Sequence, residues 1–399
     1  MNRVLLRRSA ILSACAAMGL SASAVAADVT IADLAPKDSV VVVSIDDYKQ
    51  MRAAFDRTGF KDVWSDPGMQ RWFHRQAQEF FADFEETLED LGLEKDDLKP
   101  PHGMAGGAMW MILNDDNELE PRLLIAADYG DEAEEMHGTL THLMDEGQDR
   151  DRVMVDEDEY AGVTIYKITQ LEAGEDEDDD DMGEDEWQWE EPSSPFSFDN
   201  QEMYYARSGD MLFVCSDERA LEDTIDRVKS GKELSSVREN ADYTKSLSQV
   251  GHHHMSASFL VAPFMEMMNK SKEAAGEDDF GMMMPDPMMI MGLLGVDQVK
   301  AVSLGVDFDA DAGMVEQTWS VICPEKMGLV SLLDNPTMNN TPPSFITTNT
   351  VSYTSFQFRF ADLLPTLHEM AKEMPDEMGG EIEQGLGMAE GFIGPLLAQ

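Results

Sequence analysis

The sequence predicts an α+β protein made of two related units, each an antiparallel sheet with helices packed on it. A β-branched run at Ser39–Ile45 indicates a buried strand. Turn-rich segments join later strands as hairpins. A strand followed by a helix recurs at residues 39, 254 and 350, which indicates a weaker copy of the first unit.

The predicted organisation has three parts. Residues 1–26 form a signal peptide, residues 27–250 the first α+β unit and residues 251–399 the second, weaker unit. An acidic disordered insert occupies residues 172–200 of the first unit, and a Met-rich loop occupies residues 281–294 of the second.

Strands and helices of the first unit follow from periodicity and turn chemistry. After the strand at 39–45, Asp46 or Asp47 caps a helix at 48–55, and apolar residues spaced by three to four predict a helix from Met69 to Leu91. Hairpins are predicted at 108–127 and 204–215, and a pair of strands near 153–155 and 163–169. Further helices are predicted at 132–144 and 218–229.

The second unit repeats this order. A strand is predicted at 254–262, a helix at 264–272, and a hairpin at 299–308 and 314–322. A short helix at 329–333, a strand at 350–358 and a helix at 362–373 complete it.

The first 26 residues predict export to the periplasm or the cell exterior. Three arginines open the chain, and Ala24-Val25-Ala26 fits the small-residue pattern before a cleavage site. Cys15 ends a possible lipobox, but only six residues separate it from Arg8, so ordinary secretion is favoured over a lipid anchor.

Acidity extends over the whole chain, whose formal net charge is −50. The run Glu175–Glu191 holds 12 acids, yet its removal leaves a strongly negative chain. Such a charge excludes nucleic acid and anionic membrane surfaces as expected partners. Adaptation to salt is the simpler explanation, and divalent-cation binding is the functional alternative.

Two patches resemble a known family. Leu34-Ala35-Pro36 with the following Val-rich strand, and Trp64-Ser65-Asp66-Pro67 ahead of Met69-Gln70-Arg71-Trp72, are similar to the start of an uncharacterised family of exported bacterial proteins. Ser208-Gly209-Asp210 within residues 205–228 also resembles its pattern. The resemblance implies an extracytoplasmic α+β protein and brings no catalytic residues.

His252, His253 and His254 form the first candidate metal site. Neighbouring side chains of a strand point to opposite faces, so only His252 and His254 can share one. Weak Zn²⁺ or Ni²⁺ binding is one interpretation, and a polar entrance to a strand is the other.

Acidic residues at alternating positions form the second candidate. Asp307, Asp309 and Asp311 approach the order of a calcium loop, but Gly313 falls one place late and the twelfth position is Thr318. Apolar strands on both sides favour a hairpin turn.

Methionine and tryptophan supply the candidate contact surfaces, namely Met282, Met283, Met284, Met288 and Met289, together with Trp187 and Trp189. Thioethers favour Cu(I), but 30 methionines spread over the chain indicate general use as an adaptable apolar residue. A flexible apolar contact surface is the third interpretation.

The sequence shows none of the usual nucleophile, phosphate-loop or zinc-protease motifs, and no cofactor is expected. It therefore favours a non-catalytic exported module that binds another protein or an apolar ligand. The alternatives are a hydrolase with a site assembled from distant loops and a calcium-binding protein.

Overall fold

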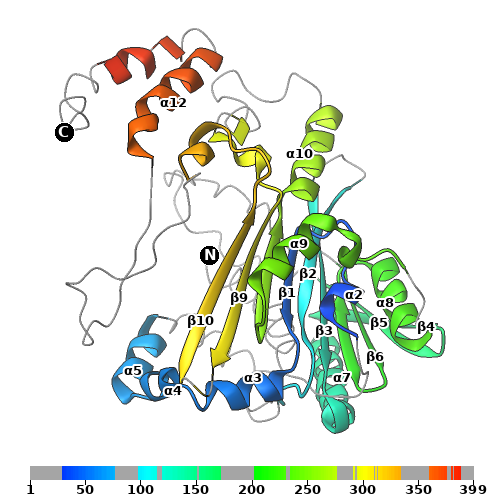
Figure 1. Cartoon of the computed structure of the whole chain (residues 1–399). Coiled ribbons are helices and arrows are strands. Elements are labelled where there is room, and N and C mark those ends of the chain that lie inside the picture. The colour runs from blue at the N-terminus through cyan, green and yellow to red at the C-terminus, as the bar shows by residue number, and fades with distance from the viewer. Residues whose placement is uncertain are drawn as a thin grey trace, which may run out of the picture. The chain divides into compact units, whose positions relative to one another are not determined.

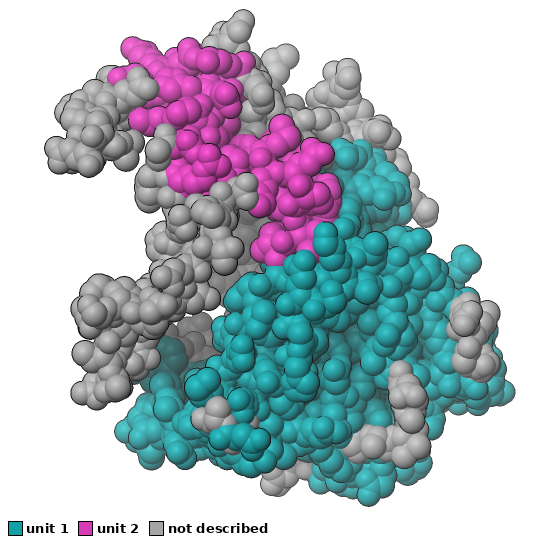
Figure 2. Space-filling model, in the orientation of Figure 1, with its two compact units in different colours: residues 1–274, 301–320 teal, residues 275–300, 321–399 magenta. Residues whose placement is uncertain are grey.

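The computed structural model describes residues 29–76, 98–114, 119–150, 152–171, 202–230, 234–275, 291–292, 294–309, 311, 313–333, 359–374, 379–380 and 382–387. The chain divides into two compact units, coloured separately in Figure 2. Unit 1 comprises residues 1–274 and 301–320, and unit 2 comprises residues 275–300 and 321–399. In the described parts, no helix is both long enough and apolar enough to cross a bilayer.

Ten described strands form one sheet in the order β10-β9-β8-β1-β2-β3-β7-β6-β5-β4 (Figure 1). The paired strands run antiparallel, which confirms the predicted α+β class. The strands are β1 (Val41–Ile45), β2 (Ala105–Leu113), β3 (Leu119–Asp128), β4 (Val153–Tyr160), β5 (Val163–Gln170), β6 (Met203–Ser208), β7 (Met211–Cys215), β8 (Met255–Leu260), β9 (Ala301–Asp309) and β10 (Met314–Ile322).

The described helices differ in length from one turn to more than four. The α-helices are α2 (Ile31–Leu34), α3 (Tyr48–Phe55), α4 (Gly59–Trp64), α5 (Pro67–Gln76), α7 (Ala133–Asp149), α8 (Glu218–Ser230), α9 (Ala241–Val250), α10 (Val261–Ala275) and α12 (Phe360–Glu373). The 3-10 turns are η2 (Gly130–Glu132), η3 (Val237–Glu239), η4 (Val296–Gln298) and η5 (Gly328–Leu333).

The two faces of the sheet carry different side chains. Ile45 at the end of β1 packs in an apolar cluster with Tyr205 and with Met136 of α7. Because side chains alternate along a strand, Ser258 of β8 points to the opposite face, where its hydroxyl lies 2.7 Å from that of Ser303. Ser246 of α9 donates to the same Ser303 hydroxyl, so α7 and α9 cover opposite faces.

The start of the described chain is anchored in unit 1. Ile31 and Leu34 of α2 are fully buried, and Arg227 donates to the carbonyl of Leu34 over 2.8 Å. Thr30 and Asp33 close a capping box at the first turn of α2. This segment therefore belongs to the core rather than to a tail.

The domain plan differs from the one that the sequence predicts. The expected boundary after residue 250 falls between α9 and β8, which both belong to unit 1. Strands β8 and β9 extend the sheet of the first unit instead of forming a second sheet, because β8 pairs with β1 along its whole length. The helix expected from Met69 to Leu91 appears as α5 up to Gln76.

Several expectations fall on residues outside the described part of the chain. These are the signal peptide and Cys15, the remainder of the helix to Leu91, the acidic insert, and the strand at 350–358. The contact residues Trp187, Trp189, Met282, Met283, Met284, Met288 and Met289 also lie outside it.

Candidate metal centre

The three histidines lie at the junction between α9 and β8. Gly251 ends α9 with a positive φ of 77°, a conformation that a residue without a side chain adopts easily. The chain then turns back along the sheet, and the amide of His254 donates to the carbonyl of Val306 over 2.9 Å. This bond places His254 opposite the end of β9, next to Asp307.

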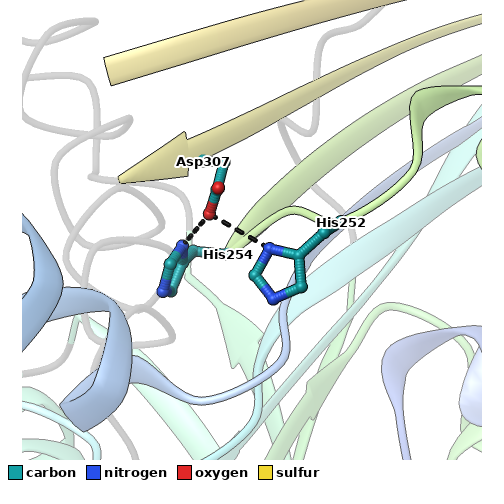
Figure 3. Close-up of side chains that lie close together, drawn as sticks. All are labelled: His252, His254 and Asp307. Carbon is teal, nitrogen blue, oxygen red and sulfur yellow. Dashed lines mark hydrogen bonds and ion pairs between the residues drawn. The ribbon is translucent and has the colours of Figure 1, made fainter. Parts of the chain in front are cut away.

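One carboxylate oxygen of Asp307 faces two imidazoles (Figure 3). Asp307 Oδ1 lies 2.5 Å from His254 Nδ1 and 3.2 Å from His252 Nδ1. The side chain of His252 is 79% exposed, whereas those of His254 and Asp307 are 18% and 23% exposed. The cluster therefore has a largely buried inner part and one solvent-facing ring.

The His254 ring has a second neighbour. The amide nitrogen of Phe308 lies 3.2 Å from His254 Nδ1 and donates to it when that nitrogen is unprotonated. In that state, two lone pairs would face each other across 2.5 Å, which is unfavourable. A hydrogen on Nδ1, which even a neutral imidazole can carry there, or a bound metal ion between the two atoms removes this conflict.

The geometry is close to that of a metal site. Ligand atoms of the three residues all lie within 4.8 Å of one another. Zinc–ligand distances of about 2.0–2.2 Å place two tetrahedral ligands about 3.3 Å apart. The separation of 3.2 Å for His252 fits this value, whereas the shorter one for His254 requires Asp307 to withdraw slightly.

Comparison with protein-family models, curated proteins and solved structures finds no match to this chain.

The structure joins two candidates that the sequence analysis kept apart. His252 and His254 come from one predicted site and Asp307 from the other, and they form the group of three possible ligands found among the described residues. Proximity of Met255 and Val306 in the β8–β9 register accounts for this meeting. The local sequence carries no sign of that pairing.

The other predicted ligands have different roles. His253 donates its ring Nδ1–H to the carbonyl of Gly251 over 2.7 Å and is not part of the group around Asp307. The carboxylate of Asp309 accepts from the amide of Asp311 over 3.0 Å, as in an Asx turn. That contact fits the predicted hairpin turn, and the three aspartates do not converge on one point.

A second histidine cluster was not visible in the sequence. His137 of α7 stacks on Tyr205, and its Nδ1 lies 2.8 Å from the tyrosine oxygen. Burial, and then the nearby Arg207 guanidinium, lower the pKa of His137 below the usual imidazole value. With Tyr166 and Arg207, it lines a pocket of about 280 Å³. Because Tyr205 is 68 residues away, no local spacing marks this cluster.

A larger acidic pocket opens at the ends of β3, β6 and β7. It has a volume of about 710 Å³ and is lined by Glu120, Arg122, Glu202, Tyr204, Ser216, Asp217, Glu218, Arg219 and Glu222. Arg122 donates to Glu120 and to the carbonyl of Ser216, so part of the acidic charge is already compensated. Burial, ahead of repulsion from neighbouring acids, raises the pKa of Glu222.

The two described cysteines are free thiols. Cys215 is fully buried in β7, and burial raises the pKa of its thiol to about 12. It therefore acts as a small apolar residue. Cys323 follows β10 and donates to the carbonyl of Glu325.

Proposed function

We propose that this chain is an exported, non-catalytic binding protein that takes one transition-metal ion between His252, His254 and Asp307. The observation that supports it is the approach of two imidazole nitrogens to a single carboxylate oxygen, at 2.5 and 3.2 Å. An ion would replace the proton that otherwise separates His254 from Asp307.

The donor atoms favour a borderline metal over calcium. Two of the three are imidazole nitrogens, which suit Zn²⁺, Ni²⁺ and Cu²⁺. Calcium instead takes six to eight oxygen atoms, and Asp309 is engaged in the adjacent turn. The site therefore supports the metal interpretation of the histidines rather than the calcium interpretation of the aspartates.

The setting favours binding over catalysis. His252 is largely exposed, and the two pockets described above are lined by other residues. Catalytic zinc sites commonly have three protein ligands and hold a water molecule at an open fourth position. The hydrolase alternative would require such a water at this site. A substrate cleft beside the metal would also be required.

Isothermal calorimetry with Zn²⁺ on the mature chain tests the proposal. Excess Ca²⁺ and NaCl in the buffer would occupy and screen the many surface carboxylates. We expect one Zn²⁺ per chain in the wild type and a loss of affinity of about 100-fold or more in His254→Ala, because removing a direct ligand should cost at least as much as removing its outer partner.

His253→Ala is the matched control. The substitution removes an imidazole from the same tripeptide, but this ring bonds to the Gly251 carbonyl. It should retain zinc affinity within about threefold, as expected for a surface change that touches no ligand. Equal weakening in His253→Ala and His254→Ala, or displacement of Zn²⁺ by the Ca²⁺ present, would refute a specific site.

A further inference from the structure

Helices α3, α4 and α5 differ in charge from the rest of the chain. Residues 48–76 contain six Lys or Arg against three Asp, a net charge of +3 in a chain of −50. The basic residues are Lys49, Arg52, Arg57, Lys61, Arg71 and Arg75. Five of them are exposed, and Lys61 is half-buried. We call the exposed side of these helices the α3–α5 surface.

The α3–α5 surface also exposes large apolar side chains. Phe60 and Val63 of α4 are each 49% exposed, and Trp72 of α5 is 51% exposed. Phe60 and Val63 are three positions apart, as are Trp72 and Arg75, so each pair shares one face of its helix. Apolar and basic side chains thus lie next to one another.

Contacts with Phe308 and Gly313 join these helices to the β9–β10 end of the sheet. The Phe55 and Phe308 rings meet edge to face with centroids 5.5 Å apart, and Gly59 donates to the carbonyl of Gly313 over 2.9 Å. Trp64 and Phe73 join α4 to α5 in the same way. Figure 1 shows the three helices in a row beyond the end of the sheet where β9 passes into β10.

Part of the positive charge remains available to a partner. Asp56 lies 3.4 Å from Arg52 and 3.7 Å from Lys61, which both lie over the Phe55 ring. Arg71 and Arg75 stand one turn apart on α5 and are exposed. Trp72 between them is 51% exposed.

We propose that the α3–α5 surface docks the protein on an anionic phospholipid surface. Arg and Lys around exposed Trp and Phe are typical of segments that lie in the interface of a bilayer, where rings enter the headgroup region and bases meet phosphates. Protruding side chains on short helices suit a fluid interface better than a rigid protein groove.

Acidic residues oppose this contact where they lie close to it, and residues 77–97, directly after α5 in sequence, contain nine acids against one lysine. At physiological ionic strength the screening length is about 8 Å, so charges beyond it contribute little. Whole-chain charge therefore predicts the long-range behaviour of the protein, while local charge decides contact. The net charge of the whole chain averages over a segment of opposite sign. This inference is independent of the metal site.

Flotation of the mature chain with vesicles at physiological salt tests the proposal. Vesicles of phosphatidylcholine containing phosphatidylglycerol should carry the protein upward, and pure phosphatidylcholine vesicles should not. The double variant Arg71→Glu/Arg75→Glu should reduce binding about tenfold or more, because it reverses two contact charges. Trp72→Ala should weaken vesicle binding at both high and low salt concentrations, since it removes the apolar contact.

Arg219→Glu/Lys245→Glu is the matched control, with the same charge change at exposed positions on α8 and α9. It should bind vesicles as the wild type does. Failure of the wild type to float with anionic vesicles would overturn the proposal, as would equal losses in the two double variants. If the α5 variant alters self-association measured by sedimentation while vesicle binding is absent, the surface is a protein contact and the lipid proposal is wrong.

Discussion

The two histidine clusters of unit 1 have opposite surroundings. His254 stands directly before β8 against a carboxylate, with the exposed His252 beside it. His137 lies on a helix between aromatic rings, bonded to the Tyr205 hydroxyl and close to the Arg207 guanidinium. Burial and the nearby guanidinium disfavour positive charge on the second imidazole, whereas the first imidazole faces a carboxylate.

This difference separates a binding cluster from a packing cluster. An imidazole that faces an anion and solvent can exchange its proton for a metal ion. An imidazole that stacks on buried tyrosines holds the neutral form and fills space. Residue type alone therefore does not identify a metal site, and the charge of the nearest groups does.

Truncation of the packing cluster should have the largest effect. Tyr205→Ala removes a fully buried ring that joins α7 to the sheet, and we expect the free energy of unfolding to fall by about 3–5 kcal/mol. Urea unfolding followed by circular dichroism measures it. His252→Ala should change the same quantity by less than about 0.5 kcal/mol, since its ring is exposed. Comparable losses in the two variants would erase the distinction.

Zinc should stabilise the protein through the binding cluster alone. At a free concentration of about 100 times its Kd, Zn²⁺ is expected to raise the free energy of unfolding by about 2.7 kcal/mol. His137→Gln should keep this increment even if its starting stability is lower, and His254→Ala should lose it. If His137→Gln abolished the zinc-dependent increment and His254→Ala retained it, the metal would bind at His137 and not at His254.

Acidification should weaken the packing cluster. The pKa of His137 is lowered in the folded chain, so the unfolded chain takes up this proton first as the pH falls. Its contribution to stability is present above the unfolded imidazole value of about 6.5 and is lost as the pH falls through the lowered folded value. The difference in stability between wild type and His137→Gln should therefore shrink between about pH 8 and pH 5. A difference that grows on acidification would contradict the sign.

The smallest effect is expected at the hairpin turn. Asp311 contributes its amide to Asp309, and its own side chain is exposed. Asp311→Ala should leave zinc affinity unchanged within about twofold, because the substitution removes no ligand. A tenfold loss in calorimetry would return the turn aspartates to the metal site.

Local structure was predictable where neighbours in sequence are neighbours in space. The helix at 48–55 and the hairpin of β6 and β7 follow from capping, periodicity and turn residues. α9 was missed, although Tyr243, Leu247 and Val250 recur at helical spacing and Asn240 caps its first turn. Its buried Ser246 contacts Ser303, a partner 57 residues away.

Long-range pairing explains what the sequence did not reveal. The single sheet depends on β8 joining β1, and the metal cluster depends on the β8–β9 register. Each candidate ligand was identified from its own short motif, but alternation along a strand gives only the face of a side chain. Which face of which other strand it meets is a property of the assembled sheet.

The position of β1 also bears on the timing of assembly. Val41 pairs with Met109 on one side and with Phe259 on the other, a partner 218 residues later. Contacts between residues so far apart in sequence make folding slow. The entropy of closing a long loop is lost before the contact can stabilise the fold. A chain made from its N-terminus holds its central strand half-paired until the segment around residue 260 has emerged. Export, which the sequence of residues 1–26 predicts, would need an unfolded chain, and late pairing of β1 with β8 would favour that state.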